Sequence, residues 1–155
     1  MGYAQTVIST AMTNFVLSTK TSTVTLPVGA ANQTIGTIVV PTLTGSVVGA
    51  YARLITSEVK NAFAGQNYVD GAQVIQVDNT AAGGYVDAID IYDTCGNSAN
   101  GASPKAIGVI IGNDDIAAKV TSGTTLTFRW TSAKAAGASL IFYCAVEVTL
   151  IMVGA

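Results

Sequence analysis

The sequence contains no histidine among its 155 residues. Histidine is the side chain that most often acts as a general base near neutral pH, and it is a common ligand of zinc, iron and copper. Its absence excludes hydrolases that rely on a Ser–His or Cys–His pair. The chain also lacks a glycine-rich phosphate loop and a nucleophile elbow of the GxSxG type. The sequence therefore predicts a protein that is not an enzyme and that uses no metal or other cofactor.

Charged residues are also scarce. They make up 10% of the sequence, whereas about 25% is typical of soluble domains. From Met1 to Ala52, Lys20 is the one charged side chain. The formal net charge of -2 is too small to favour binding to nucleic acid or to an anionic membrane surface. A protein surface with so few charged side chains suits close packing against copies of the same chain, because little charge has to be desolvated on contact.

The chain has no apolar run long enough to span a membrane as a helix. The most apolar stretch, Leu140–Val153, includes one charge, Glu147, and is shorter than the roughly 20 residues that a membrane-spanning helix needs. The opening residues MGYAQTVIST show neither the basic segment nor the continuous apolar core of a secretory signal. We therefore expect no signal peptide and no transmembrane segment.

The alternation typical of β-strands is abundant. Three apolar side chains of TTLTFRWT fall on one face: Leu126, Phe128 and Trp130. The threonines and Arg129 fall on the other face, which predicts a strand with one buried and one wet side. Related patterns, rich in Thr, Val and Ile, occur in QTVISTAMTNFVL, TSTVTLPV, QTIGTIVVP, GSVVGAYARLIT, AQVIQVD, GYVDAIDIYD and AIGVIIG. In GSVVGAYARLIT we expect Val47, Tyr51 and Ile55 to share one face.

Helical signals are weak by comparison. SEVKNAF could form about two turns with Ser57 as its N-cap, and NDDIAAKV could form one turn capped by Asp114 or Asp115. Turn signals rich in glycine and asparagine separate the strands, and no linker or internal repeat is visible. With eight or nine strands and at most one or two short helices, the sequence predicts one all-β sandwich or barrel over residues 1–155.

The stretch Leu140–Val153 has two different faces when it is treated as a strand. One face is wholly apolar and belongs in the core. The other is apolar at both ends, with Glu147 and Thr149 in its middle. A solvent-exposed face would carry more polar residues than this second face does. Because the chain has few helices that could cover it, the second face would have to be covered by another subunit or by a folded loop. We interpret it as a subunit interface formed by Ile141, Tyr143, Ile151 and Val153.

An acidic cluster offers a weaker pattern for a metal. Asp87, Asp90 and Asp93 lie close in sequence, and Asp93 with Asn97 and nearby carbonyls could hold a calcium ion in a loop. Asp87 and Asp90 would face opposite sides of a strand unless a bulge intervenes. Solvated carboxylates are therefore the simpler interpretation, and we expect no metal site.

Aromatic residues offer a pattern for sugar stacking. The side chains concerned are Trp130, Tyr51, Tyr68, Tyr85 and Tyr92. Trp130 alternates with other apolar residues, so a position in the core is the simpler interpretation. Tyr68 lies in a polar loop and is better placed for a surface contact. We do not expect a small-molecule ligand.

The two cysteines, Cys95 and Cys144, are too few for a disulfide framework and lack metal-binding spacing. Cys144 lies in an apolar strand, where a cysteine usually behaves as a small hydrophobe. A bridge between the two cysteines stays open at this point.

Eight or nine Thr- and Val-rich strands, few helical signals, little charge and no catalytic residues resemble the single jelly-roll structural proteins of viruses and phages. These are capsid, penton, decoration, and spike or fibre subunits. The resemblance covers the whole chain but lies in its architecture, so it transfers no site residue. It implies an antiparallel, jelly-roll-like β-sandwich whose subunits pack around a symmetry axis.

The function implied by this resemblance is that of a non-enzymatic virion structural protein, such as a minor capsid, decoration or spike subunit. Its partners would be copies of itself and other capsid proteins, without nucleic acid, and it would assemble in the host cytoplasm. The alternative is a surface or secreted β-sandwich binding module of the carbohydrate-binding, adhesin or pilus-like kind.

Overall fold

The computed structural model describes residues 12–20, 22–26, 29–61, 73–80, 83–90, 108–112, 114–134 and 140–154. These residues form nine strands and one short 3-10 helix, in agreement with the predicted count. The elements are β1 (Met12–Ser18), β2 (Ser22–Leu26), β3 (Gly29–Val39), β4 (Ser46–Asn61), β5 (Gln73–Asn79), β6 (Val86–Asp90), β7 (Gly108–Ile111), η1 (Ala117–Lys119), β8 (Thr125–Lys134) and β9 (Leu140–Val153).

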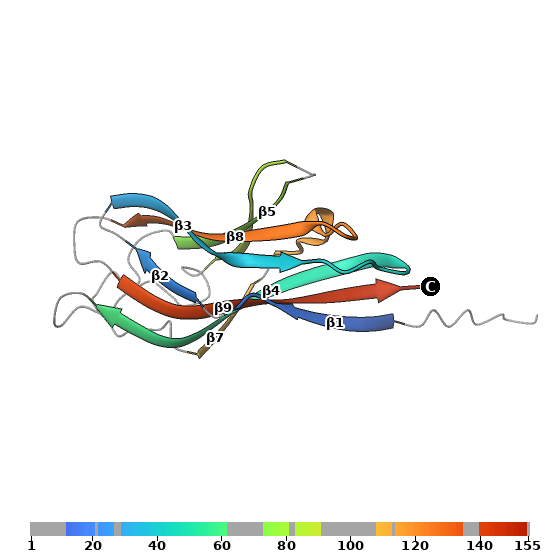
Figure 1. The fold of residues 1–155 in the computed structure, drawn as a ribbon, viewed down its shortest axis with the longest axis horizontal. Coiled ribbons are helices and arrows are strands. Elements are labelled where there is room, and N and C mark those ends of the chain that lie inside the picture. The colour runs from blue at the N-terminus through green and yellow to red at the C-terminus, as the bar shows by residue number, and fades with distance from the viewer. Residues whose placement is uncertain are drawn as a thin grey trace, which may run out of the picture.

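The strands form two antiparallel sheets that pack as a sandwich. One sheet has the order β1-β9-β4-β7, and β2 pairs with the same edge of β9 as β1 does. The other sheet has the order β3-β8-β5-β6. Figure 1 shows the two layers, with β3, β8 and β5 in one and β9, β1 and β7 in the other. The predicted all-β sandwich is confirmed.

The strand pairs are nested in the order of a jelly roll. β1 pairs with β9, β3 with β8, β4 with β7, and β5 with β6. The chain therefore forms an antiparallel ribbon whose first and last strands meet and whose innermost pair is β5–β6. Wrapping such a ribbon into two sheets gives the eight-stranded jelly roll, with β1 and β2 counted as one interrupted strand.

Thr19 occupies the interruption between β1 and β2. Its backbone N–H donates to the Val146 carbonyl oxygen (2.9 Å), and its Oγ1 accepts a hydrogen bond from the Val146 N–H (3.0 Å). The hydroxyl thus satisfies a backbone donor of β9 where the edge strand is irregular. Gly36 of β3 lies against this point, since a Cβ there would come within 3.1 Å of the Thr19 Cβ. A larger residue at position 36 would therefore require the Thr19 side chain to shift.

The core lies between the two sheets and follows the predicted alternation. The predicted inward residues of β8 are fully buried: Leu126, Phe128 and Trp130. On β9 the described inward residues are buried as well: Cys144, Val146, Val148, Leu150 and Met152. Burying each large apolar side chain stabilises the fold by about 1.5–3 kcal/mol. These two strands therefore contribute much of the core that holds the sheets together.

Strand β4 corrects two expectations. The predicted helix from Ser57 is wrong, because β4 continues to Asn61 and pairs with β9 along that whole length. A two-turn helix has little stability of its own, whereas β9 offers a complete ladder of backbone partners. The expected shared face of Val47 and Tyr51 is also wrong. The register shifts between Val47 and Gly49, so Val47 packs against the core while Tyr51 points outward.

The second helical expectation is confirmed in a reduced form. NDDIAAKV contains the 3-10 helix η1, but its N-cap residue is Ile116, whose side chain makes no capping hydrogen bond, so the expected N-cap at Asp114 or Asp115 is wrong. The Asp115 Oδ1 accepts hydrogen bonds from the N–H groups of Ala117 and Ala50, both at 2.9 Å. One carboxylate therefore orders the start of the turn and ties it to β4 in the other half of the chain.

Candidate functional site

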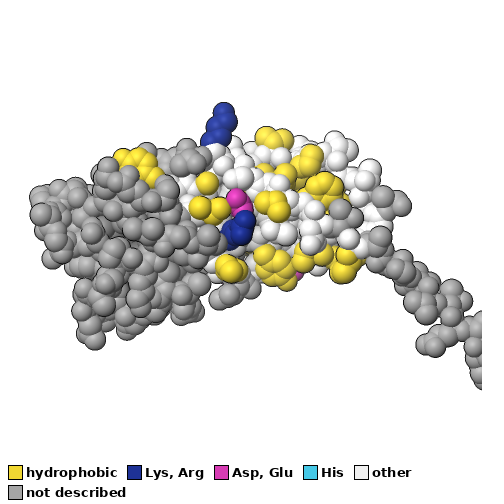
Figure 2. Space-filling view, turned by 90° about the horizontal axis from the view of Figure 1, so that it is seen from below, with side chains coloured by type: hydrophobic (Ala, Val, Ile, Leu, Met, Phe, Trp, Pro, Cys, Tyr) yellow, Lys and Arg dark blue, Asp and Glu magenta, His cyan; other side chains and the backbone are white. Residues whose placement is uncertain are grey.

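The sheet of five strands, β1, β2, β9, β4 and β7, has an outer face that points away from the sandwich core and is unusually apolar. We call this face the five-strand outer face. Its described side chains, assigned from the strand register, are Met12, Asn14, Val16, Ser18, Ser46, Tyr51, Arg53, Ile55, Ile111, Tyr143, Ala145, Glu147, Thr149, Ile151 and Val153. Figure 2 views the molecule from this side and shows hydrophobic side chains spread over the surface. Large apolar residues therefore cover a sheet surface that nothing else in the described chain covers.

The exposure of these side chains shows how little they are covered. Met12 is 68% exposed, Val16 60%, Ile111 61% and Tyr51 39%. Single exposed apolar residues are common, but a contiguous set on one sheet face usually marks an interaction site. The five-strand outer face is therefore the candidate functional site of this protein.

One ion pair lies in the middle of this face. Arg53 on β4 and Glu147 on β9 are direct cross-strand partners, and the Arg53 Nε donates to the Glu147 Oε2 at 2.7 Å. The Arg53 Nη2 donates to the same oxygen. Figure 2 shows a basic and an acidic side chain touching within the apolar surroundings. Because the charges neutralise each other, the face carries no net charge among its described side chains.

The opposite surface of the sandwich carries a polar network, although the exposed Val39 of β3 also lies on it. On the outward side of the β3-β8-β5-β6 sheet, Arg129 donates to the Gln76 Oε1 from Nε (3.0 Å) and Nη2 (2.8 Å). Gln76 in turn donates to the Asp87 Oδ1 (2.7 Å), and the Arg129 guanidinium lies 3.6 Å from the centre of the Tyr85 ring. Threonines continue this face along β8. This surface is therefore mainly a solvent-exposed face of the usual polar kind. By contrast, the outer face of the other sheet is the more apolar of the two.

Three of the four predicted interface residues lie on the five-strand outer face. Tyr143, Ile151 and Val153 point outward from β9 and are half-buried by neighbouring strands. Ile141 pairs with Thr25 and Lys60, but its side chain is outside the described part of the structure. Whether these residues bind a subunit stays a prediction.

Sequence reasoning missed the contributions of the neighbouring strands to this face. Met12 and Val16 lie on β1, Tyr51 on β4 and Ile111 on β7, and all four are exposed. None of their segments shows an unusual pattern alone. Only the strand order places them beside β9, so no local signal in the sequence could have found them.

The acidic cluster forms no described metal site. Asp87 lies on the polar outer face and accepts a hydrogen bond from Gln76. A bulge does interrupt the pairing of β5 with β6, but the side chain of Asp90, and Asp93 and Asn97 altogether, lie outside the described residues. Among the residues that the structure describes, no three acidic, cysteine or histidine side chains gather closely enough to hold a metal.

The aromatic residues do not form a common stacking platform where they are described. Trp130 is fully buried, which confirms the core interpretation. Tyr51 lies on the five-strand outer face, whereas Tyr85 packs under Arg129 on the opposite surface. Tyr68 and Tyr92 lie outside the described residues.

Cys144 is a free, buried thiol, so it forms no disulfide with Cys95, which lies outside the described residues. Burial raises the pKa of the Cys144 thiol to about 11. A thiol that stays protonated at neutral pH is a poor nucleophile and metal ligand. Cys144 is a core residue here.

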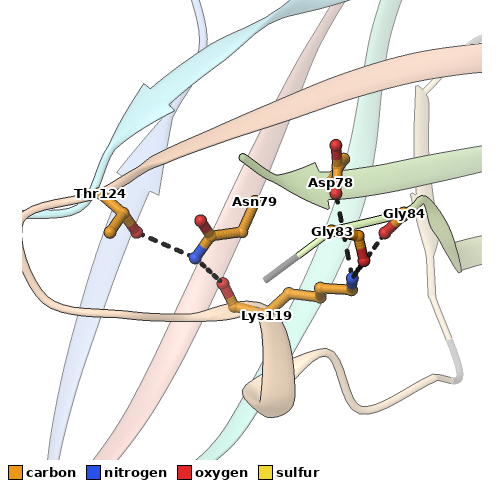
Figure 3. Close-up of polar contacts among 6 residues, drawn as sticks. All are labelled: Asp78, Asn79, Gly83, Gly84, Lys119 and Thr124. Atoms are coloured by element: carbon orange, nitrogen blue, oxygen red, sulfur yellow. Dashed lines mark hydrogen bonds and ion pairs between the residues drawn. The ribbon is translucent and has the colours of Figure 1, made fainter. Parts of the chain in front are cut away.

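A buried lysine that the sequence did not single out organises one end of the sandwich. Figure 3 shows Lys119 of η1 pointing at the turn between β5 and β6. Its Nζ donates to the Gly83 and Gly84 carbonyl oxygens (2.7 and 2.5 Å) and lies 3.9 Å from the Asp78 carboxylate. Buried Asn79 donates to the Lys119 carbonyl oxygen (2.7 Å) and to the Thr124 Oγ1 (3.0 Å). The cluster ties three segments together and has a structural role.

Comparisons with family models, with characterised proteins and with solved structures found no match to this chain. No helix within the described ranges is long and apolar enough to cross a membrane.

Proposed function

We propose that this protein is a non-enzymatic structural protein that assembles with copies of itself through the five-strand outer face. The observation that carries the proposal is the contrast between this apolar face and the polar, hydrogen-bonded face on the other side of the same sandwich. One side of the molecule is suited to water and the other to a protein surface.

The size of the face fits a stable contact. With about 3.3 Å per residue along β9 from Tyr143 to Val153 and about 4.8 Å between strands, the face measures roughly 35 by 20 Å, or about 700 Å². A standard protein interface buries about 800 Å² on each partner. Arg53 and Glu147 are already paired with each other, so covering them leaves no isolated charge.

Within this proposal we assign the protein to the virion structural proteins, as a minor capsid, decoration or spike-type subunit. The jelly-roll strand order, the scarcity of charge and the absence of histidine support this class. Other capsid proteins are then its further partners, and assembly takes place in the host cytoplasm before incorporation into the virion.

The test is the mass of the purified protein in solution, measured by light scattering after size exclusion, with electron microscopy of the peak. Assembly predicts a discrete symmetric oligomer, or particles or filaments. A monomer of 15.7 kDa at every concentration tested would overturn the proposal.

A second candidate function is a carbohydrate-binding or adhesin-like surface module. The observation that favours it is the exposed side chain of Tyr51. Tyr51 precedes Arg53 by two residues on β4, so it lies in the row next to the Arg53–Glu147 pair on the same face. An aromatic ring beside hydrogen-bonding groups can stack on and orient a sugar. A monomer that binds a defined glycan, with binding lost in Tyr51→Ala, would favour this function over assembly.

A further inference from the structure

The centre of the five-strand outer face has a regular pairing of large and small side chains. Tyr51 on β4 lies opposite Thr149 on β9, and Ile55 on β4 lies opposite Ala145 on β9. The row between them is the Arg53–Glu147 pair. In these three rows β4 carries the larger or basic residue and β9 carries the smaller or acidic one. Over these three rows the surface therefore has a ridge along β4 and a shallower, acidic strip along β9, whereas in the next row Gly49 of β4 lies opposite Ile151 of β9 and the order of sizes is reversed.

Two copies of such a surface can meet face to face in two symmetric ways. Aligned sheets keep their strands within about 30° of each other, which leaves a two-fold axis along the strands or across them. An axis across the strands through the central row would place Arg53 over Arg53 and Glu147 over Glu147. It would also place Tyr51 over Ile55, so that bulky residues oppose each other.

An axis along the strands exchanges the two strips. Arg53 of one copy then lies over Glu147 of the partner copy, and both ion pairs join into a four-charge network. Tyr51 lies over the partner copy's Thr149, and Ile55 lies over the partner copy's Ala145. Large side chains facing small ones can interdigitate at the density of a protein core.

We propose that the five-strand outer face binds a second copy of this chain about a two-fold axis parallel to β4 and β9, with β4 of each copy over β9 of the other. This inference rests on the proposed function and adds the symmetry and register of the contact. The occupant is a second copy because the described face is self-complementary in charge: it carries one base and one acid and no net charge. Interfaces of this isologous kind are the commonest in soluble oligomers.

The test uses two opposite charge changes, Arg53→Glu and Glu147→Arg. Each variant alone places like charges over like charges in the dimer, and we expect its dimerisation constant to weaken by at least about tenfold. In an equimolar mixture, the acidic face of one variant meets the basic face of the other. We expect the mixed dimer to recover to within about tenfold of the unchanged protein.

A matched control places a charge on the polar side of the sandwich. Thr37 of β3 is exposed and pairs with Thr127 of β8, and both belong to the sheet that does not form the proposed contact. Thr37→Glu should therefore leave dimerisation unchanged. Circular dichroism of each variant verifies that it is folded. A mixture of folded Arg53→Glu and Glu147→Arg that stays as dissociated as each variant alone would overturn the inference.

Cross-linking distinguishes the two axes without changing a charge. Packed sheets lie about 10 Å apart, farther than the roughly 6 Å between the Cα atoms of a disulfide, so a short bismaleimide is the suitable reagent. A mixture of Tyr51→Cys and Thr149→Cys should give a covalent dimer. The unchanged protein and each variant alone, treated with the same reagent, measure the background of linkage. Preferential linkage of Tyr51→Cys to Ile55→Cys would show an axis across the strands and overturn the inference.

The outcomes separate this inference from the proposed function. Suppose that the unchanged protein assembles and Ile151→Asp dissociates it, but the charge variants do not complement each other. Assembly through the five-strand outer face is then supported, and the two-fold register proposed here is wrong. If the unchanged protein is a monomer, both fall.

Discussion

Arg53 and Glu147 face each other across β4 and β9 on the outside of the sheet, and the Arg53 guanidinium donates twice to the same carboxylate oxygen. The Arg53 side chain is 46% exposed and that of Glu147 20% exposed. An ion pair accessible to water contributes little to folding, typically about 0–1 kcal/mol. Its position in the middle of an apolar face therefore fits the proposed contact with a second copy better than a role in folding stability.

Replacing Arg53 with methionine should leave the folded monomer almost as stable as before. We expect a loss of less than about 1 kcal/mol in the free energy of unfolding, because the pair is exposed and the methionine retains apolar contact area. Urea denaturation at a concentration low enough to keep the protein monomeric measures this quantity. A loss of several kcal/mol would show that the pair has a structural role instead.

Replacing Lys119 with methionine should destabilise the protein by about 1–3 kcal/mol, because the change removes hydrogen bonds from two carbonyl groups and leaves the Asp78 carboxylate without its cation. The matched control is Lys20→Met, since Lys20 is exposed. Thermal denaturation of the two variants should show a clear decrease in Tm only for Lys119→Met. Equal Tm values would contradict a structural role for the cluster.

Cys144 should make stability depend on pH in the alkaline range. Burial raises the pKa of this thiol from 9.0 to about 11, so the folded state holds the proton more tightly than the unfolded state does. Its contribution is fully present below pH 9 and is lost as the pH rises toward 11. Comparing the free energy of unfolding of the protein and of Cys144→Ala across this range isolates the contribution. A constant difference between the two would contradict the expected shift.

Gly112 should tolerate no side chain, although its backbone conformation is ordinary. A Cβ at this position would lie 2.2 Å from the Ala88 carbonyl oxygen and 2.8 Å from that of Ala52. Gly123 is the control, because its φ of 74° favours glycine but a Cβ there meets nothing within 4 Å. We expect Gly123→Ala to cost about 1–2 kcal/mol and Gly112→Ala distinctly more, as measured by chemical denaturation. The reverse order would contradict this packing.

Much of the fold follows from local patterns. The alternation around Trp130 and along Val146–Met152 predicts which side chains are buried, because a strand turns successive residues to opposite faces. The same rule fails along β4. An extra residue at Val48 shifts the register, so Val47 and Tyr51 end on different faces. A bulge has no reliable local signature, and the sequence could not predict this one.

The candidate site is only partly predictable for a related reason. The two faces of β9 differ visibly in the sequence, which is why Tyr143, Ile151 and Val153 could be predicted to point outward. The contributions of Val16, Tyr51 and Ile111 depend on which strands lie beside β9. Strand order is set by long-range pairing, so these residues become visible only in the folded structure.

The most direct test of the assembly face compares two substitutions of apolar residues by aspartate. Ile151→Asp introduces a charge into the five-strand outer face, and Val39→Asp introduces one at a 69% exposed position on the other sheet. Sedimentation velocity of the unchanged protein and both variants, with circular dichroism to verify folding, measures the effect. We predict that Ile151→Asp sediments as a folded monomer while Val39→Asp keeps the oligomer of the unchanged protein. An unchanged sedimentation profile for Ile151→Asp would contradict the proposal that this face holds the assembly together.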